Sequence, residues 1–241
     1  MTDKPRWQLD RATNFYRWAA WLALLVALAG FFLTYSLPLW RGSFEGPAAS
    51  HVHGALLFGW LLMVVLQTNL ARRPALHRRV GWIGLALAVA VALSTAVIGH
   101  EAAQRGLARG DGPIAVSGFL GSITAPAIFL ALVTAAIALR RRPQWHKRLI
   151  FVATVAIMWP AWFRWRHFLP GLPRPEITLS LIAADLPILI AMARDRVRFG
   201  GIHPAYLTAG LGLILEQTFE TFAFDNPRWR AVANWLYMQA G

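Results

Sequence analysis

Long runs of apolar residues, separated by short polar segments, dominate the pattern of this chain of 241 residues. A helix rises about 1.5 Å per residue, so about 20 apolar residues cross the hydrocarbon core of a bilayer. The pattern predicts seven such helices, over 18–40, 54–71, 80–99, 113–139, 149–169, 177–192 and 205–224. The last two runs are the weakest, because Asp185 lies in the sixth and Glu216 and Glu220 lie in the seventh.

The polar segment between the second and third runs recurs between the fourth and fifth. Residues 72–79 read RRPALHRR and residues 141–148 read RRPQWHKR. Five of the eight positions are identical, and a sixth exchanges Arg78 for Lys147. Each copy is short enough to be the turn of a membrane hairpin. We therefore expect a duplicated helical hairpin, in which helices two and three correspond to helices four and five.

Basic residues are concentrated in alternate polar segments. The net charge is +13, and the N-terminal tail, the two repeats with Arg140 and the turn at 194–198 hold 16 of the 24 Lys and Arg residues. Loops rich in Lys and Arg stay in the cytoplasm, so we expect the N-terminus inside and the C-terminus outside. The lipid bilayer is then the expected partner, and no nucleic acid is needed to explain the charge.

The composition is that of an all-α membrane protein: 57% of the residues are apolar and the mean hydropathy is +0.46. There is no cysteine, which excludes thiolate metal sites, iron–sulfur clusters and disulfides. We expect a single transmembrane domain over 1–241 in a bacterial inner membrane, with a cytoplasmic tail at 1–17 and a seven-helix bundle at 18–224. At 225–241 we expect an outer interfacial amphipathic helix, with Trp229, Val232, Trp235 and Leu236 on one face.

His77 and His146 occupy the same position in the two repeats, at the cytoplasmic starts of helices three and five. Two imidazoles that face each other across a helical bundle are suitable axial ligands for a b-type haem. One interpretation is therefore a haem b site formed by these histidines, with electron transfer to a redox partner as the function. The alternative is that each histidine orders its turn by bonding loop carbonyls, while the arginines meet anionic lipid.

A second group of candidate ligands is expected at the outer ends of the helices. Imidazole and carboxylate groups bind zinc and other divalent ions, so we interpret this layer as an outward-facing metal or small-ligand site. The alternative is a solvated rim with ordinary ion pairs, because no tight spacing such as His-Glu-x-x-His is present. The candidate residues are His53, His100, Glu101, His167 and Glu216.

Asp185 and Glu216 lie near mid-membrane depth when counted from the ends of their runs. A lone carboxylate there costs about 2.5–3.5 kcal/mol on insertion scales, so it normally faces the protein interior with a partner. The functional interpretation is a proton or substrate relay. The alternatives are an interhelical pair with Arg164 or a protonated acid that is hydrogen-bonded across the bundle. Neither interpretation defines a reaction, so no catalytic residue is assigned.

Several motifs resemble those of a widespread family of functionally unassigned bacterial multi-pass membrane proteins. They are HVHG at 51–54, GW at 59–60, Gln67, LHRRVG at 76–81, WHKRL at 145–149 and AT at 153–154. The resemblance covers about residues 50–170. It implies a shared topology and no particular activity.

The chain is also similar in architecture to cytochrome b561-type electron carriers, which place histidines at the ends of four successive helices and hold two haems. His51 or His53, His77 and His146 match that scheme. Helix four departs from it, because no histidine lies near its outer start at 116–122. The likeness therefore implies the inner haem pair, and it implies an outer haem only if His100 or His167 substitutes for the missing histidine. A non-catalytic transporter or a partner in the assembly of a membrane complex is a third class of function that the sequence leaves open.

Overall fold

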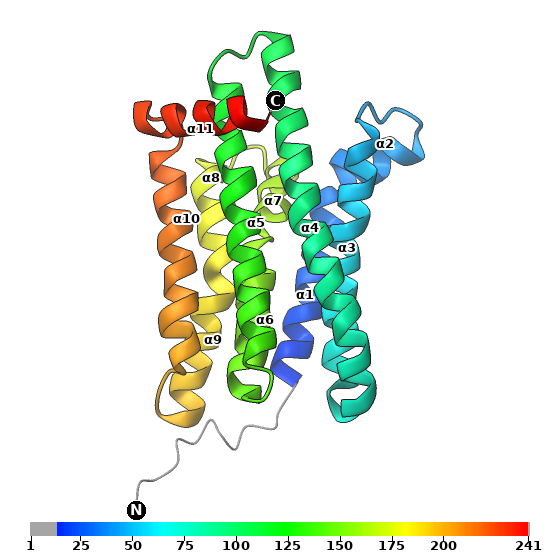
Figure 1. The fold of residues 1–241 in the computed structure, drawn as a ribbon, viewed down its shortest axis with the longest axis vertical. Coiled ribbons are helices and arrows are strands. Elements are labelled where there is room, and N and C mark those ends of the chain that lie inside the picture. Colours follow the sequence, from blue (N-terminus) through cyan, green and yellow to red (C-terminus); the bar gives the residue numbers. More distant parts are fainter. Residues whose placement is uncertain (1–13, 241) are drawn as a thin grey trace, which may run out of the picture.

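The computed structural model describes residues 14–240, and every regular element in this range is helical. The predicted cytoplasmic tail lies outside the described residues up to position 13. The long helices run roughly parallel, whereas the last helix lies across one end of the bundle (Figure 1). The α-helices are α1 (Asn14–Phe31), α2 (Leu37–Trp40), α3 (Ala48–Asn69), α4 (Pro74–Arg109), α5 (Ile114–Ala138), α6 (Pro143–Ala156), α7 (Trp159–Arg164), α8 (Pro175–Ile177), α9 (Ala184–Phe199), α10 (Leu211–Ala223) and α11 (Pro227–Ala240).

Three π-helical segments continue these helices within the described range. They are η2 (Phe32–Ser36) between α1 and α2, η5 (Thr178–Ala183) before α9 and η6 (Tyr206–Gly210) before α10. Two short 3₁₀ turns, η3 (Leu70–Arg72) and η4 (Trp165–His167), follow α3 and α7. π-helical turns are rare and occur frequently at functional sites, so their surroundings are of interest below.

Five helical stretches are long and apolar enough to cross a membrane, which is consistent with a multi-pass membrane protein. They are Asn14–Trp40, Ala48–Arg72, Pro74–Ala108, Ile114–Ala138 and Pro175–Phe199. The other two predicted spans are helical but do not meet this criterion. The fifth is interrupted between α6 and α7, and the seventh, formed by η6 and α10, contains Glu216 and Glu220.

A proline explains the interruption in the fifth predicted span. Pro160 has no N–H group, so it cannot donate to the carbonyl of Ala156, four residues earlier, and α6 ends at that residue. The chain passes through Ile157 and Met158 and starts again as α7. Pro126, in contrast, lies inside α5, which continues to Ala138.

The two repeats form turns with the same backbone conformation. Arg73 has φ −122° and ψ 74°, and its counterpart Arg142 has φ −110° and ψ 83°. Each is followed by a proline, Pro74 or Pro143, at the first turn of the next helix, a position where the missing N–H costs nothing. The sequence repeat is therefore also a repeat of local structure, in the α3–α4 and α5–α6 hairpins.

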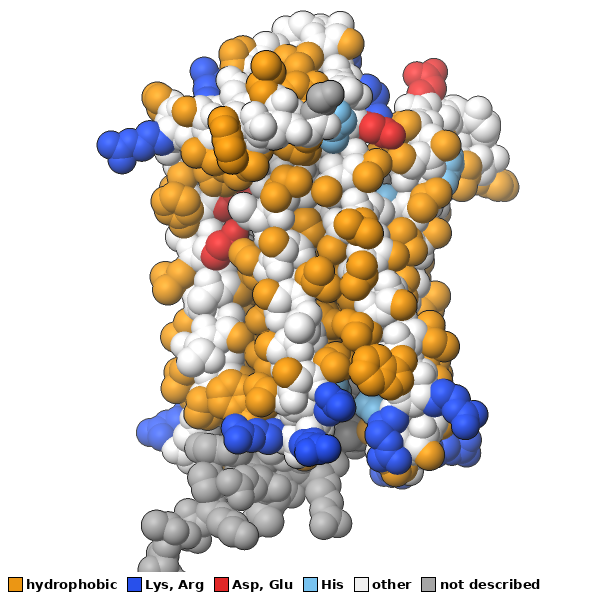
Figure 2. All heavy atoms as spheres, in the orientation of Figure 1, with side chains coloured by type: hydrophobic (Ala, Val, Ile, Leu, Met, Phe, Trp, Pro, Cys, Tyr) orange, Lys and Arg blue, Asp and Glu red, His pale blue; other side chains and the backbone are white. Residues whose placement is uncertain are grey.

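Lysine and arginine side chains form a belt at the end of the molecule where α1 begins and where the two repeat turns lie (Figures 1 and 2). Large apolar side chains are exposed along the shaft of the bundle, among them Trp18 at 72%, Leu93 at 65% and Leu215 at 69%. Apolar surface of this extent fits contact with lipid tails rather than with water.

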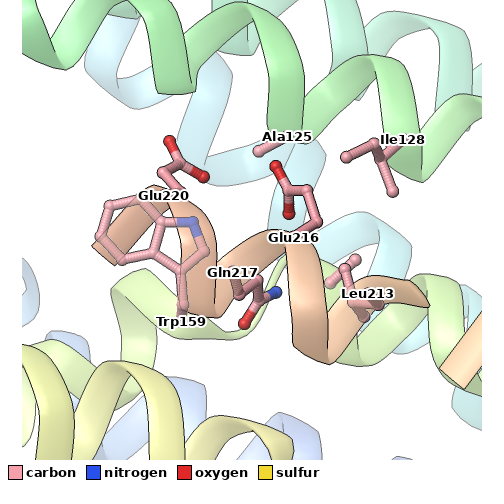
Figure 3. Close-up of a pocket in the computed structure, with 8 residues that line it drawn as sticks. Ala125, Ile128, Trp159, Leu213, Glu216, Gln217 and Glu220 are labelled. Carbon is pink, nitrogen blue, oxygen red and sulfur yellow. The ribbon is translucent and has the colours of Figure 1, made fainter. Parts of the chain in front are cut away.

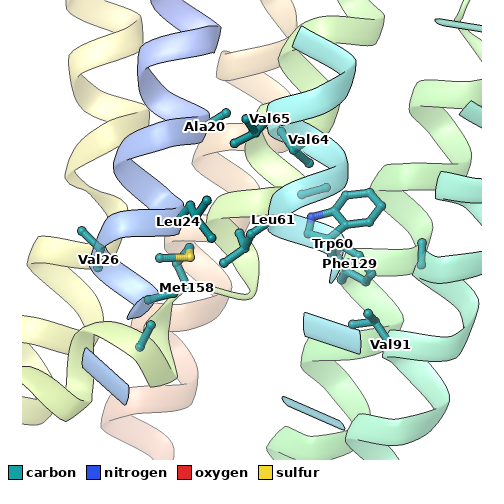
Figure 4. Close-up of a cluster of buried hydrophobic side chains, with 14 of the residues drawn as sticks. Ala20, Leu24, Val26, Trp60, Leu61, Val64, Val65, Val91, Phe129 and Met158 are labelled. Carbon is teal, nitrogen blue, oxygen red and sulfur yellow. The ribbon is translucent and has the colours of Figure 1, made fainter. Parts of the chain in front are cut away.

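The main core lies between α1, α3, α4, α5 and the α6–α7 break (Figure 4). Trp60 is its largest aromatic residue and packs edge-on against Phe129, with 4.9 Å between ring centroids. The indole N–H of Trp60 donates to the hydroxyl of Thr154 at 3.4 Å. Small residues such as Ala20 and Ala153 allow the backbones to approach closely, which is the usual way in which helices associate inside a membrane.

The C-terminal helix forms at Pro227–Ala240, as predicted, but its packing face differs from the expected one. Trp229 and Ala233 are buried, and the cluster that contains them includes Leu236 and Tyr237. Val232 and Trp235 are exposed at 47% and 62%. The buried face follows the i, i+4, i+7, i+8 spacing against α5, and the indole N–H of Trp229 donates to the carbonyl of Ser117 at 2.9 Å.

An ionic contact joins α6 to α9 near the basic end of the bundle. Arg148 and Asp195 are both fully buried, and the guanidinium Nη2 lies 2.8 Å from Oδ2 of the carboxylate. Nε of Arg148 also donates to Asp195, at 3.1 Å, and Nη1 donates to the side-chain oxygen of Gln144 at 2.7 Å. Every guanidinium nitrogen therefore donates a hydrogen bond, which offsets the cost of removing both charges from water.

We expect Arg148→Met to destabilise the protein by up to about 3–5 kcal/mol. The fully buried Asp195 loses the guanidinium that binds both of its oxygens, and it keeps the single contact with Nη1 of Arg194 at 3.2 Å. The double variant Arg148→Met/Asp195→Leu is expected to recover most of that loss. Arg79→Met is the matched control, since Arg79 has the same place in the first repeat but is exposed. Unfolding free energies in detergent micelles measure the effect, and equal losses from Arg148→Met and Arg79→Met would contradict it.

The burial of His203, in the turn between α9 and η6, leads us to expect that the stability of the protein depends on pH. Burial, with Arg148 and Lys147 adding to the effect, lowers the pKa of His203 to about 4, and its Nδ1 accepts a hydrogen bond from the N–H of Ala205 at 3.1 Å. The unfolded chain, with an ordinary histidine pKa, binds the proton at higher pH than the folded chain does. Stability is therefore expected to fall as the pH falls from about 6.5 towards about 4.

His203→Asn removes this titration while keeping an acceptor near the position of Nδ1. The variant is expected to lose less stability than the native chain over the same pH interval. Unfolding curves recorded at a series of pH values measure this difference. Parallel profiles for the two proteins would show that His203 does not carry the effect.

Candidate functional site

The structure places His77 and His146 next to each other at the basic end of the bundle. Their ring centroids are 6.1 Å apart and their planes are at 77°. Metal–imidazole bonds are about 2 Å long, so two imidazoles on opposite sides of one metal ion have centroids roughly 6 Å apart. The distance between these rings is compatible with a shared metal ion, and it also lies within the range of an ordinary edge-to-face contact between two rings.

The same backbone contact orients both rings. Nδ1 of His77 lies 3.3 Å from the carbonyl of Gln67, and Nδ1 of His146 lies 2.8 Å from the carbonyl of Ala136. In each case the acceptor is ten residues before the histidine, on the preceding helix of its hairpin. A carbonyl accepts, so Nδ1 of each ring carries a proton. In the neutral form of such a ring the lone pair is on Nε2. Histidines that bind metals commonly have this second contact.

Polar and basic groups lie near His77 and His146. The side-chain amide of Gln67 donates to the carbonyl of His77 at 3.2 Å, while its Oε1 is buried without a hydrogen-bond partner. The exposed arginines of the two turns lie next to the histidines in sequence, at 72, 73, 78, 79, 141 and 142. The site therefore combines two oriented imidazoles, an unsatisfied acceptor and a concentration of positive charge.

The five outer residues predicted as a metal layer do not form one cluster. Among the described residues, no group of three or more His, Asp or Glu side chains is arranged to hold a metal ion. His100 stacks on Tyr237 of α11 with 5.1 Å between centroids, and Glu101 pairs with Arg105 at 3.3 Å. His167 is exposed on η4. His100 and Glu101 are thus occupied by separate contacts, the first with α11 and the second within α4.

Glu216 lies with the other membrane acids. It lines a cavity of about 10 Å³, enough for about one water molecule, together with Gln217 and Glu220. The two glutamates project from α10 towards α5, where Gly121 leaves room for Glu220 (Figure 3). Oε1 of Gln217 is buried without a partner in the described structure.

Asp185 is also buried, at 4% exposure, and neither of its oxygens has a hydrogen-bond partner in the described part of the chain. The suggested ion pair of Arg164 with Asp185 or Glu216 is not formed. Nη1 of Arg164 donates to the carbonyl of Pro160 at 2.9 Å, and its guanidinium lies 4.0 Å from the centroid of Phe31. The arginine contributes to a different cavity from the one that Glu216 lines.

That second cavity, which we call the outer cavity, has a volume of about 200 Å³. It lies between α1 with η2, α3, α4 and the α6–α7 break. Its polar lining comprises Thr34, Tyr35, Ser50, His53 and Arg164, and its apolar lining comprises Ala27, Phe31, Phe44, Gly54, Leu57, Phe58, Leu61, Ile98, Ile157, Met158, Pro160 and Ala161. Of the five predicted metal ligands, His53 alone lines this cavity.

Sequence reasoning missed the outer cavity although it had identified some of its parts. Arg164 was expected as a possible ion-pair partner of the membrane acids, and Thr34 and Tyr35 belong to the first predicted span, where no site was expected. The available signal was the combination of Pro160 inside a predicted span with an arginine four residues later, since irregular backbone inside a membrane is tolerated only where it is buried or lines a cavity. The apolar pattern of the first predicted span gave no indication that η2 would be π-helical.

Comparisons of the chain with protein-family models, with curated proteins and with solved structures gave no match. The arguments about function therefore rest on the geometry described above.

Proposed function

We propose that the protein is a multi-pass membrane electron-transfer protein in which the imidazoles of His77 and His146 would hold a b-type haem. The observation that supports this best is the separation of 6.1 Å between the two ring centroids. The two rings come from the same position in the two copies of a duplicated hairpin. Their pairing therefore follows from the arrangement of the two hairpins, not from the conformation of a single loop. When bound, the haem supplies one-electron redox chemistry.

The residues around the histidines have definite tasks in this proposal. The carbonyls of Gln67 and Ala136 hold the proton on each Nδ1 and thereby fix the rotation of each ring. This leaves Nε2 of both rings as the ligand atom. The hydrogen bonds also increase the basicity of the imidazoles, which strengthens their binding to iron.

The basic residues of the repeat turns suit the charges of such a group. Haem b carries two propionates, and arginine binds carboxylates well because its donors form a planar fork. Six arginines in the two turns are exposed at this end of the molecule. They also provide a positive surface for an acidic redox partner.

We further propose that the chain resides in a bacterial inner membrane with the repeat turns in the cytoplasm. The belt of Lys and Arg at one end of the bundle supports this orientation (Figure 2). The proposed redox site is then on the cytoplasmic side, whereas the outer cavity and α11 face the other side.

Protein purified from cells supplied with haem is expected to show a Soret band, and α and β bands after reduction with dithionite. His77→Ala and His146→Ala are each expected to abolish these bands, because each removes one of the two imidazoles that would hold the haem. His167→Ala is the control, since His167 is exposed on η4 and distant in sequence from both repeats. Absorption spectra of equal amounts of folded protein make the comparison.

Elemental analysis of the same samples distinguishes the two outcomes that would contradict haem binding. A flat visible spectrum with stoichiometric zinc that depends on His77 and His146 would replace haem with a simple metal ion. A flat spectrum without bound metal would reduce the pair to a contact that orders the two turns.

Orientation can be tested in a chain that has no native cysteine. Ala75→Cys in the first repeat turn and Asn234→Cys on α11 both introduce an exposed thiol. In intact spheroplasts, a membrane-impermeant maleimide is expected to label Asn234→Cys, and to label Ala75→Cys only after permeabilisation. The reverse pattern would place the repeat turns outside.

A further inference from the structure

The outer cavity contains one fixed charge without a carboxylate partner. Among the described residues that line it, Arg164 is the one Lys or Arg side chain, and no Asp or Glu is present. Its contacts are the carbonyl of Pro160 and the ring of Phe31. A guanidinium has five N–H donors, so most of its capacity for hydrogen bonds is still available to a ligand.

Other polar groups of the cavity are also incompletely satisfied. Oγ1 of Thr34, on the π-helical η2, is buried without a hydrogen-bond partner. His53 contacts Ser94 through Nδ1 at 3.1 Å, and the hydroxyl of Ser94 donates to the carbonyl of Val91 at 3.0 Å. Ser94 therefore accepts from Nδ1–H, and in the neutral ring Nε2 is an acceptor rather than a second cation.

Size and lining restrict the ligand further. An engineered apolar cavity of about 150 Å³ binds benzene, so the 200 Å³ of the outer cavity suit one six-membered ring with a small substituent. Most of the wall is apolar or aromatic, with Phe31, Phe58 and Met158 among its members. A single guanidinium matches one negative charge, and a planar carboxylate can bind it in a bidentate manner.

From these observations we infer that the outer cavity binds a small monocarboxylate whose apolar body is about the size of one ring. Arg164 binds the carboxylate, Thr34 and His53 lie at the polar end, and the apolar body lies against α3 and the α6–α7 break. This site is separate from the histidine pair, so it stands whether or not the protein holds haem.

Benzoate is a suitable probe, and benzyl alcohol is its uncharged counterpart. Calorimetric titration of the protein in nanodiscs, corrected for partition into empty nanodiscs, is expected to show saturable binding of benzoate at one site. Benzyl alcohol is expected to bind at least about tenfold more weakly, because it lacks the charge-assisted hydrogen bonds. Equal binding of the two probes, or no saturable binding of benzoate in the millimolar range, would overturn the inference.

Variants assign the binding to the cavity. Arg164→Gln is expected to weaken benzoate binding at least about tenfold, and Arg164→Lys to retain part of it. Arg166→Gln is the matched control: Arg166 also lies over an aromatic ring, Phe163 at 3.9 Å, and bonds a backbone carbonyl, but it does not line the cavity.

Filling the cavity provides a test that leaves Arg164 intact. Gly54 lines the outer cavity, and a Cβ placed on it meets no other atom within 4 Å. Gly54→Leu is therefore expected to fold and to lose benzoate binding. If Gly54→Leu and Arg164→Gln both bind benzoate like the native chain while melting at the native temperature, the ligand site is elsewhere.

Discussion

The buried pair of Arg148 and Asp195 is the constraint on which the second half of the structure depends. Both side chains are fully buried, and separating them would leave Arg148 in the interior without a carboxylate, so the pair holds α6 and α9 in one register. The guanidinium also lies 5.5 Å from the centroid of Tyr206, whose hydroxyl is 3.1 Å from that of Tyr16. The pair thereby connects α6 with η6 and α1 as well.

This constraint reaches the proposed redox site because Arg148 is two residues after His146. The start of α6 cannot rotate without separating Arg148 from Asp195, so the direction of the His146 ring is determined partly by an ion pair that does not touch it. The first repeat lacks this support, since Arg79, the counterpart of Arg148, is exposed. His77 is instead held by α3, through the reciprocal contacts between Gln67 and His77.

Much of the fold followed from the apolar runs, because a helix is the ordinary way to satisfy backbone hydrogen bonds in lipid. The repeat turns and the proximity of His77 and His146 were also predictable, since matching turns bring matching residues to the same depth. The outer layer was less predictable. The depth and the direction of side chains such as His53, His100 and Glu216 depend on how the helices pack. The hydrophobic pattern of a membrane helix gives little indication of either, because lipid and core are both apolar.

The contrast between the two ends of the bundle has a common explanation in the duplication. At the basic end the repeats kept the same turn, the same proline and the same histidine, and the result is a nearly symmetric pair of imidazoles. At the other end the second helices of the two hairpins diverged: α4 continues for 36 residues, whereas α6 stops after 14. Pro160 ends α6, and the break that follows contributes residues to both the outer cavity and the small cavity beside Glu216. The paired imidazoles thus lie where the two repeats agree, and the two cavities lie where the second copy departs from a regular helix.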